Sequence, residues 1–306
     1  MRSEPVALVL VLALLASGCS IKRLAVNKVG DAIASSGSGY ESDEDPELVR
    51  EALPFSLKLL ESLLSESPQH EGMLLAACKG FTSYAYAYVD REAELALEED
   101  LDRGLALEQR ARKLYLRALG YGLRGLELQS PGLSEGLLTD PQGAVAAVEE
   151  RHVPLLYWSA ASLGLAISVS LDEAAMVARL PEVEALLDRA LALDERWQDG
   201  ALHEFVIVLE SARPMGSGGR DALQPHFERA LDLSHGDRAS VYLAWAESVS
   251  VKEQNVGEFR SLLGQALAID PDRRTELRLS NLLAQRRARW LLERTDDLFL
   301  EAGDAP

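Results

Sequence analysis

A short pattern near the end of three predicted helices constrains the fold more than any other feature of this sequence. Its copies are Leu187–Asp194, Phe227–Ser234 and Leu263–Asp270, and each carries an Ala-Leu pair shortly before a turn. The shared alanines are at positions 190, 230 and 266, at intervals of 40 and 36 residues. Helical pairs that repeat about every 34 residues, with a small Ala where two helices approach closely, are typical of tetratricopeptide repeats (TPR). Chance alignment of Ala- and Leu-rich helices is the alternative, and three copies with similar turns argue against it.

The rest of the mature sequence favours the same architecture. Strong helix formers fill the intervals between apolar residues three and four apart, and alternating runs of β-branched residues are lacking. Asp45 and Pro46 are typical of a helix N-cap and first position, and Leu60–Pro68 is an earlier copy of the pattern. We therefore expect an all-α chain, a TPR-like helical-hairpin solenoid with irregular repeats. Helix breaks are expected at Pro68, Ser130–Gly132, Asp140–Pro141, Pro181, Arg213–Gly219, Ser234–Asp237 and Asp270–Pro271.

The N-terminus resembles a bacterial lipoprotein signal. Val6–Ala16 is an unbroken apolar run; it is too short for the roughly 20 residues that span a bilayer, but it suits a secretory signal. Residues 16–19 (Ala-Ser-Gly-Cys) resemble a lipobox, although Ala16 stands where Leu is usual. Ser20 after the cysteine favours the outer membrane over the inner one. An ordinary signal with a stray Cys is the alternative.

These features predict three segments. Residues 1–18 form a cleaved lipoprotein signal peptide, residues 19–45 form an N-terminal tether lipidated at Cys19, and residues 46–306 form the TPR-like α-helical domain. Residues 34–46 are rich in Ser, Gly and acidic side chains, which cannot bury a core and are typical of a tether. We expect membrane attachment only through the lipid anchor, on the periplasmic side of the envelope.

The charge of the chain excludes one class of partner. The sequence has 31 Lys and Arg against 49 Asp and Glu, a formal net charge of −18 at pH 7. Binding to a phosphate backbone depends on clustered basic residues. Nucleic acid is therefore not expected as a partner.

Residues that could carry chemistry are sparse. None of the five histidines lies four residues from another His or a Cys, so a metal site is not expected. Cys78 lies in an apolar segment with no nearby His to activate it, and it is predicted to be a small buried hydrophobe. Many carboxylate pairs exist but none is singled out by the sequence. We expect no catalytic residues, no cofactor and no enzyme activity.

Aromatic residues give the most specific hint of a binding surface. Tyr84, Tyr86 and Tyr88 alternate with alanines, and Tyr84 and Tyr88 share one helical face. Tyr157 and Trp158 lead into a run of Ser and Ala that leaves room beside the rings. These residues favour a groove or channel for an apolar or elongated ligand. Packing of the rings over alanines is the alternative for each of them.

Several segments spread over the mature chain resemble the TatT family, lipoproteins with tetratricopeptide repeats that are associated with tripartite ATP-independent periplasmic (TRAP) transporters. The segments that carry the resemblance are Asp45–Lys58, Phe81–Val89, Leu114–Ala118, Tyr157–Trp158, Gly200–Glu204, His226–Leu231, Asn281–Leu283 and Arg287–Ala288. The loop Pro214–Gly219 departs from the tighter Gly-Gly turn of the family.

The resemblance implies a periplasmic, all-helical lipoprotein that forms a homotrimer and has a pore through each protomer. It also implies docking of the transporter's substrate-binding protein and passage of a small, apolar ligand. Carried over to this sequence, Cys19 is the lipid site. The candidates for lining the pore are Tyr84, Tyr88, Tyr115, Tyr157 and Trp158.

Two functions follow as hypotheses. The first is a TRAP-type transport component that docks a substrate-binding protein and relays its ligand. The second is a generic TPR-like envelope lipoprotein, which scaffolds a complex by holding a peptide segment on its concave surface. An envelope hydrolase ranks last because the sequence offers no residues for it.

Overall fold

A computed structural model describes residues 24–34, 37–212 and 219–300. All regular structure within these ranges is helical, without a strand, which confirms the all-α prediction. Residues 24–34 form a first helix. The elements that follow are α2 (Gly37–Glu41), α3 (Pro46–Glu66), α4 (Glu71–Tyr84), η1 (Ala85–Asp90), α5 (Arg91–Glu99), α6 (Leu101–Glu127), α7 (Leu133–Leu137), α8 (Pro141–Val145), η2 (Glu150–His152), α9 (Val153–Ser168), α10 (Ala174–Val177), α11 (Leu180–Leu193), η3 (Trp197–Gly200), α12 (Ala201–Ala212), α13 (Arg220–Ser234), α14 (Ala239–Trp245), η4 (Ala246–Ser250), α15 (Val256–Ala268), η5 (Thr275–Leu277), α16 (Arg278–Glu293) and α17 (Thr295–Leu298).

Local sequence signals set most helix ends. Asp45 caps α3 as predicted, because its side chain accepts hydrogen bonds from the backbone N–H of Glu47 and Leu48. The expected breaks within the described residues fall between helices, and Pro181 lies in the first turn of α11. Residues 213–218 of the break predicted at Arg213–Gly219 lie outside the described residues, as do the signal segment and Cys19.

One helix boundary has no Gly or Pro signal. The backbone at Asp100 is extended (φ −148°, ψ 95°), so α5 ends there. The Asp100 side chain then caps α6 by accepting a hydrogen bond from the backbone N–H of Arg103. This turn separates two helix-forming segments that the sequence pattern does not divide.

The three sequence repeats occupy equivalent places in the structure, at the C-terminal ends of α11, α13 and α15. Ala190, Ala230 and Ala266 are fully buried, in agreement with close helix packing at these positions. The second of these alanines lies close to Gly200, which has a positive φ of 89° and where an added Cβ would lie 3.0 Å from the Cα of Ala230. Only glycine fits both the backbone conformation and the space at that position.

The apolar interior consists of three clusters that follow one another along the chain. The first is built on α3 and α4, the second on α6, α9 and α11, and the third on α14, α15 and α16. Helix α12 belongs to the last two, because Leu202 and Leu209 pack in the second cluster and Ile207 packs in the third. The interior is therefore a chain of neighbour-to-neighbour contacts, as expected for a solenoid.

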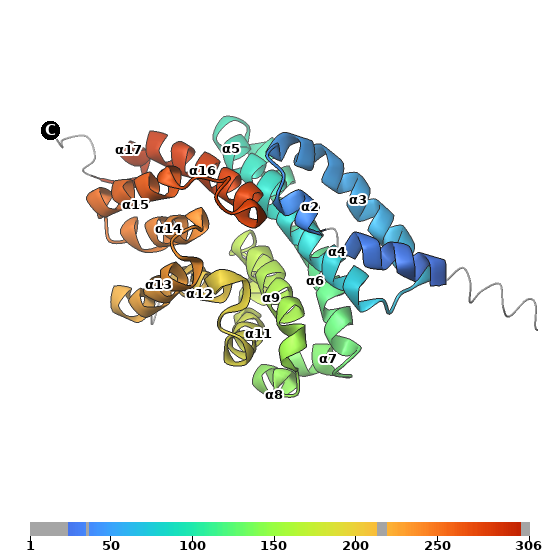
Figure 1. The fold of residues 1–306 in the computed structure, drawn as a ribbon. Helices are drawn as coiled ribbons and strands as arrows, with labels where there is room; N and C mark the ends of the chain where they lie inside the picture. Colours follow the sequence, from blue (N-terminus) through green and yellow to red (C-terminus); the bar gives the residue numbers. More distant parts are fainter. Residues whose placement is uncertain (1–23, 35–36, 213–218, 301–306) are drawn as a thin grey trace, which may run out of the picture.

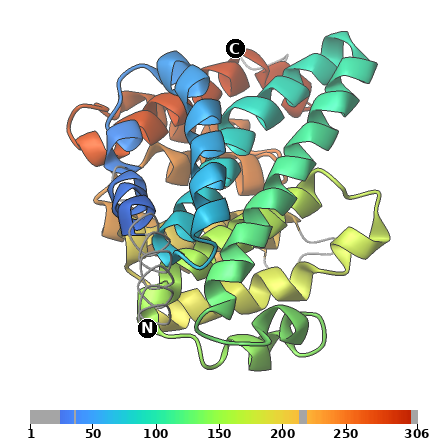
Figure 2. The same ribbon diagram turned by 90° about the vertical axis from the view of Figure 1, so that its right-hand side faces the viewer.

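The solenoid curves until its two ends meet. Helix α16 contacts α2 and α3, and Figure 1 shows α16 beside α5 and α2 at one side of the molecule. Figure 2 shows α6 as a long helix that runs across the body, with the α5–α6 turn projecting at one end. In the described ranges, none of the helices combines the length and the apolar character needed to cross a bilayer.

Candidate functional site

One arginine of α16 links the regions of two short π-helical segments. The first segment, η1, joins α4 to α5, and the second, η4, follows α14. Arg287 of α16 binds Glu94 of α5, four residues after the end of η1, and Glu247 within η4. Single-turn π segments inside helices are frequent at functional sites, since they redirect side chains that an α-helix would present elsewhere. We therefore take this meeting point as the centre of the candidate site.

The charges at this centre are balanced. The Nη1 and Nη2 atoms of Arg287 lie 2.6 and 2.9 Å from the carboxylate oxygens of Glu94, and Nη2 also lies 2.9 Å from Oε2 of Glu247. Arg91 donates a further hydrogen bond of 3.0 Å to Glu94. Burial alone raises the pKa of Glu94, but hydrogen bonds and charges from Arg287 and Arg91 bring it below its usual value. Two guanidinium groups and two carboxylates thus neutralise each other.

Tyr86 belongs to this centre, and sequence reasoning missed it. Its hydroxyl accepts a hydrogen bond of 2.8 Å from Nη2 of Arg91, whose guanidinium carbon lies 4.7 Å from the ring centroid. The two residues are five apart, a spacing that a π-helix brings together and an α-helix does not. The Tyr-Ala-Tyr-Ala-Tyr run was the available signal, but an α-helical interpretation gave weight to Tyr84 and Tyr88. With 45% of its surface exposed, Tyr86 is the most accessible of the three tyrosines.

Tyr84 and Tyr88 lie together, with ring centroids 5.9 Å apart. Tyr84 is half-buried between the first and second apolar clusters. Tyr88 is buried and donates its hydroxyl proton to the carbonyl oxygen of Pro46 at 2.9 Å, so it ties η1 to the start of α3. Burial raises the pKa of Tyr88 to about 12.

Tyr115 lies on α6, packs next to η1 and is fully buried. Its hydroxyl donates a 2.9 Å hydrogen bond to Oδ2 of Asp90, the last residue of η1. Burial raises the pKa of Asp90, although the hydrogen bond from Tyr115 and the charge of Arg91 act against the rise. Tyr115 therefore holds the C-terminal end of η1 in place.

Tyr157 and Trp158 on α9 form the densest group of rings. The Tyr157 ring lies 5.1 Å from Trp158, 4.6 Å from Trp197 and 5.9 Å from Phe205. Trp158 is half-buried against the first apolar cluster, and Nζ of Lys79 lies 5.9 Å from its ring centroid. Burial and the negative charge of Glu204 raise the pKa of Tyr157. Trp197 and Phe205 are partners that sequence reasoning did not identify, because they lie about 40 to 50 residues further along the chain.

The described residues contain no group of three or more His, Cys, Asp or Glu side chains that could hold a metal ion. Nδ1 of His203 on α12 lies 2.9 Å from Nδ1 of His226 on α13, and burial lowers the pKa of both rings. Cys78 is fully buried, as expected, and burial raises the pKa of its thiol to about 12. The thiol is therefore protonated at neutral pH and is a poor nucleophile.

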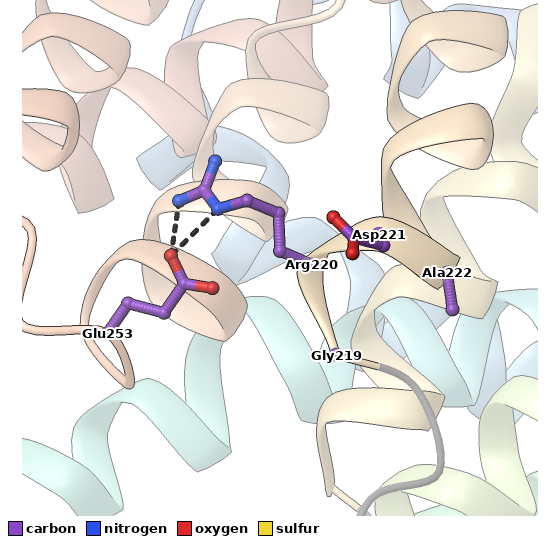
Figure 3. A pocket seen from close by; sticks show the side chains of 5 residues that line it. All are labelled: Gly219, Arg220, Asp221, Ala222 and Glu253. Atoms are coloured by element: carbon purple, nitrogen blue, oxygen red, sulfur yellow. Dashed lines mark hydrogen bonds and ion pairs between the residues drawn. The ribbon is translucent and has the colours of Figure 1, made fainter.

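An open depression of about 620 Å³ lies elsewhere, at the start of α13 (Figure 3). It is lined by Gly219, Arg220, Asp221, Ala222 and Glu253. Figure 3 shows the guanidinium of Arg220 turned toward Glu253, and Arg220 also pairs with Glu258 at 2.7 Å. The one cation in its lining, Arg220, is already paired with two carboxylates, and the depression contains none of the aromatic candidates.

Comparison with known proteins gives two matches. A family model described as TRAP transporter T-component (TAtT) matches residues 42–299. A protein of Treponema pallidum (strain Nichols), described only as an uncharacterized protein, is 28% identical over 307 residues, which cover 94% of this chain and 95% of the relative. The family match spans every element from α3 to α17, including both π-helices and the aromatic group.

Proposed function

Because this chain belongs to the TRAP transporter T-component family, we propose that it is the lipid-anchored, periplasmic component of a TRAP-type transport system. In this role it docks the substrate-binding protein of the system and relays a small, apolar ligand through the interior of the curved solenoid. The observation that carries the proposal is the link from the Arg287 centre to the aromatic group: Arg91 joins Glu94 to Tyr86, and Tyr86 lies close enough to Tyr157 to raise the pKa of that tyrosine. We call the surface of Tyr86, Arg91 and the rings around Tyr157 the internal wall.

The chemistry of the wall favours binding over catalysis. The rings of Tyr157, Trp158, Trp197 and Phe205 offer apolar surface with defined edges, which suits an apolar body of modest size. The charged groups near them are paired with each other, so they hold the wall in shape without demanding a charged ligand. Tyr84, Tyr88 and Tyr115 are proposed as the remaining part of the lining and its support.

The anchor and the assembly are parts of the same proposal. Acylation of Cys19 would attach the chain to the periplasmic face of the outer membrane. Much of the segment predicted as a tether is helical and packs on the domain, since Val26 and Ile33 lie against the first apolar cluster and α2 contacts α16. The domain would therefore lie close to its anchor. Homotrimer formation would place three such interiors side by side. A transport component of this kind needs no bond chemistry, which agrees with the paired charges and the unreactive thiol of Cys78.

One experiment tests docking and ligand passage together. The full chain with a C-terminal affinity tag is purified from membranes of its own cell, and bound proteins and extracted small molecules are identified by mass spectrometry. We expect a TRAP-type substrate-binding protein and one apolar class of small molecule. Envelope-assembly proteins without a substrate-binding protein would refute the transport role and favour the peptide-scaffold alternative.

Substitutions in the aromatic group then test whether its rings bind the small molecule. Tyr157→Ala and Trp158→Ala should reduce the amount of co-purified small molecule several-fold, because each removes a ring from the apolar surface. Phe55→Ala is the matched control, since Phe55 is 73% exposed on the outer side of α3. Equal small-molecule content in all three variants and the wild type would contradict the proposed lining.

A further inference from the structure

The two ends of the solenoid meet through charged side chains. Arg286 on α16 binds Glu47 on α3 at 2.6 Å, and Arg294 at the end of α16 binds Glu98 on α5 at 2.5 Å. Arg287 binds Glu94 on α5 at 2.6 Å. Arg278 donates a hydrogen bond of 2.9 Å to the carbonyl oxygen of Ser42, between α2 and α3. We call this contact between α16 and the helices α3 and α5 the seam.

The apolar clusters do not continue across the seam. The buried residues of α16 that belong to a cluster (Ala284, Ala288 and Leu291) pack with α14 and α15. Within the residues that the structure describes, no cluster combines residues of α16 with residues of α3, α4 or α5. Among the described residues, the seam therefore lacks an apolar cluster of its own.

The opposite side of the curved chain is continuous. Helix α12 carries Leu202 and Leu209 into the second cluster and Ile207 into the third. Among the described elements, α12 alone contributes buried residues to both of these clusters. If the N-terminal block (α3–α11) moved relative to the C-terminal block (α13–α17), α12 would be the pivot and the displacement would be largest at the seam.

We propose that the seam is an electrostatic clasp: the Arg286–Glu47, Arg287–Glu94 and Arg294–Glu98 pairs hold the solenoid closed, and their release opens it sideways about α12. Opening exposes Arg91 and Tyr157 of the internal wall along its side and widens access to Tyr86, which is already 45% exposed. A ligand can then reach the wall laterally as well as along the axis. The clasp does not depend on what passes through the interior, so a rigid seam would leave the proposed transport role intact.

The exposure of the ion pairs makes the clasp sensitive to salt. Arg286 and Glu47 are each about half exposed, and Arg294 and Glu98 are 28% and 40% exposed. Pairs of this kind are weak, and salt screens them because the Debye length falls from about 10 Å at 0.1 M to about 3 Å at 1 M. Arg287 is only 14% exposed and is also held by Glu247. It should therefore remain with the C-terminal block when the seam opens.

Spin-label distances across the seam test the proposal on the full chain. Cysteines replace two exposed residues that belong to none of the pairs, as Glu51→Cys on α3 and Arg289→Cys on α16. Cys78 is fully buried and does not compete for the label, and Cys19→Ser removes the remaining thiol. The reference pair is Glu51→Cys with Lys113→Cys on α6, which lies within the N-terminal block.

In the Arg286→Gln/Arg294→Gln background we expect a longer distance between the labels at 51 and 289 to become roughly three- to tenfold more populated. We expect the same trend when the seam is unmodified and the solution contains 1 M NaCl. The 51–113 distance should not change. Arg103→Gln/Arg229→Gln is the matched control, because the ion pairs of these two arginines with Glu92, Glu195 and Asp232 lie outside the seam. The charge swap Glu98→Arg/Arg294→Glu should restore the short distance.

An unchanged 51–289 distance in both the variant and high salt would overturn the clasp. Equal lengthening of the 51–113 distance would also overturn it, since that result means general loosening of the fold. If the double variant does not fold, as judged by its far-UV circular dichroism, the salt series on the unmodified seam decides the question.

Discussion

Arg287 and Glu94 are 193 residues apart in the sequence, and two hydrogen bonds of 2.6 and 2.9 Å join their side chains. The same guanidinium reaches Glu247 at 2.9 Å and lies 4.2 Å from the ring centroid of Trp290. One side chain therefore connects α5, η4 and α16. This contact is one of those that join the two ends of the solenoid.

Removal of Arg287 should destabilise the protein. Arg287→Met leaves Glu94 and Glu247 partly buried without their main cation, and we expect a loss of about 1–3 kcal/mol in the free energy of unfolding. Arg287→Met/Glu94→Gln should recover part of the loss, because it removes one of the stranded charges. Urea denaturation of the single and the double variant measures both free energies of unfolding. A double variant less stable than the single one would contradict this account.

A methyl group at Gly200 should be costly and the same group at Gly264 should not. Gly200 has φ 89°, and an added Cβ would lie 3.0 Å from the Cα of Ala230, so Gly200→Ala should lose about 1–3 kcal/mol. Gly264 lies in α15 with open space around its Cα. Gly264→Ala should gain about 0.5–1 kcal/mol from helix propensity. Thermal unfolding of the two variants checks the contrast, and equal shifts would contradict it.

The His203–His226 contact should make stability depend on pH. Burial and the neighbouring His226 lower the pKa of His203, while Glu195 acts in the opposite direction; burial also lowers the pKa of His226, against the charge of Glu210. A lowered folded-state pKa means that the unfolded chain binds more protons. Stability from these groups is therefore present above the usual histidine pKa of about 6.5 and is lost as the pH falls.

The double variant His203→Gln/His226→Gln isolates this effect. Between pH 7 and pH 5 the wild type should lose more of its unfolding free energy than the variant, as measured by urea denaturation at each pH. His235→Gln is the control, because His235 lies in the turn after α13, outside the pair. Parallel pH dependence in the wild type and the double variant would remove the pair as its cause.

Cys78 should not react in the folded protein. Its thiol is fully buried and has a pKa raised to about 12 by burial, so the thiolate that attacks alkylating reagents is scarce at pH 8. In a Cys19→Ser chain, iodoacetamide should modify Cys78 at least about a hundredfold more slowly than an introduced Glu51→Cys thiol. Modification in urea should remove the difference. Fast labelling of the native protein would show that α4 opens locally.

Part of the candidate site followed from local sequence. Tyr157 and Trp158 are adjacent in the chain, and the run of Ser and Ala after them predicted a helical surface with room beside the two rings. Trp197 and Phe205 could not be assigned to the same group, since they come from η3 and α12 and meet Tyr157 only after the chain has turned back. Tyr86 was missed because π-helical spacing depends on how η1 packs, and residue preferences do not report it.

The sequence by itself determined the helices, their caps and the alanines at the closest contacts, because these depend on neighbours within a few turns. Asp45 and Ala230 could be interpreted without knowledge of the rest of the chain. The tertiary structure alone decided that the two ends meet and that Arg287 lies between Glu94 of α5 and Glu247 of η4. Each of these depends on small angles between successive helices that accumulate over the whole solenoid, and no local pattern encodes their sum.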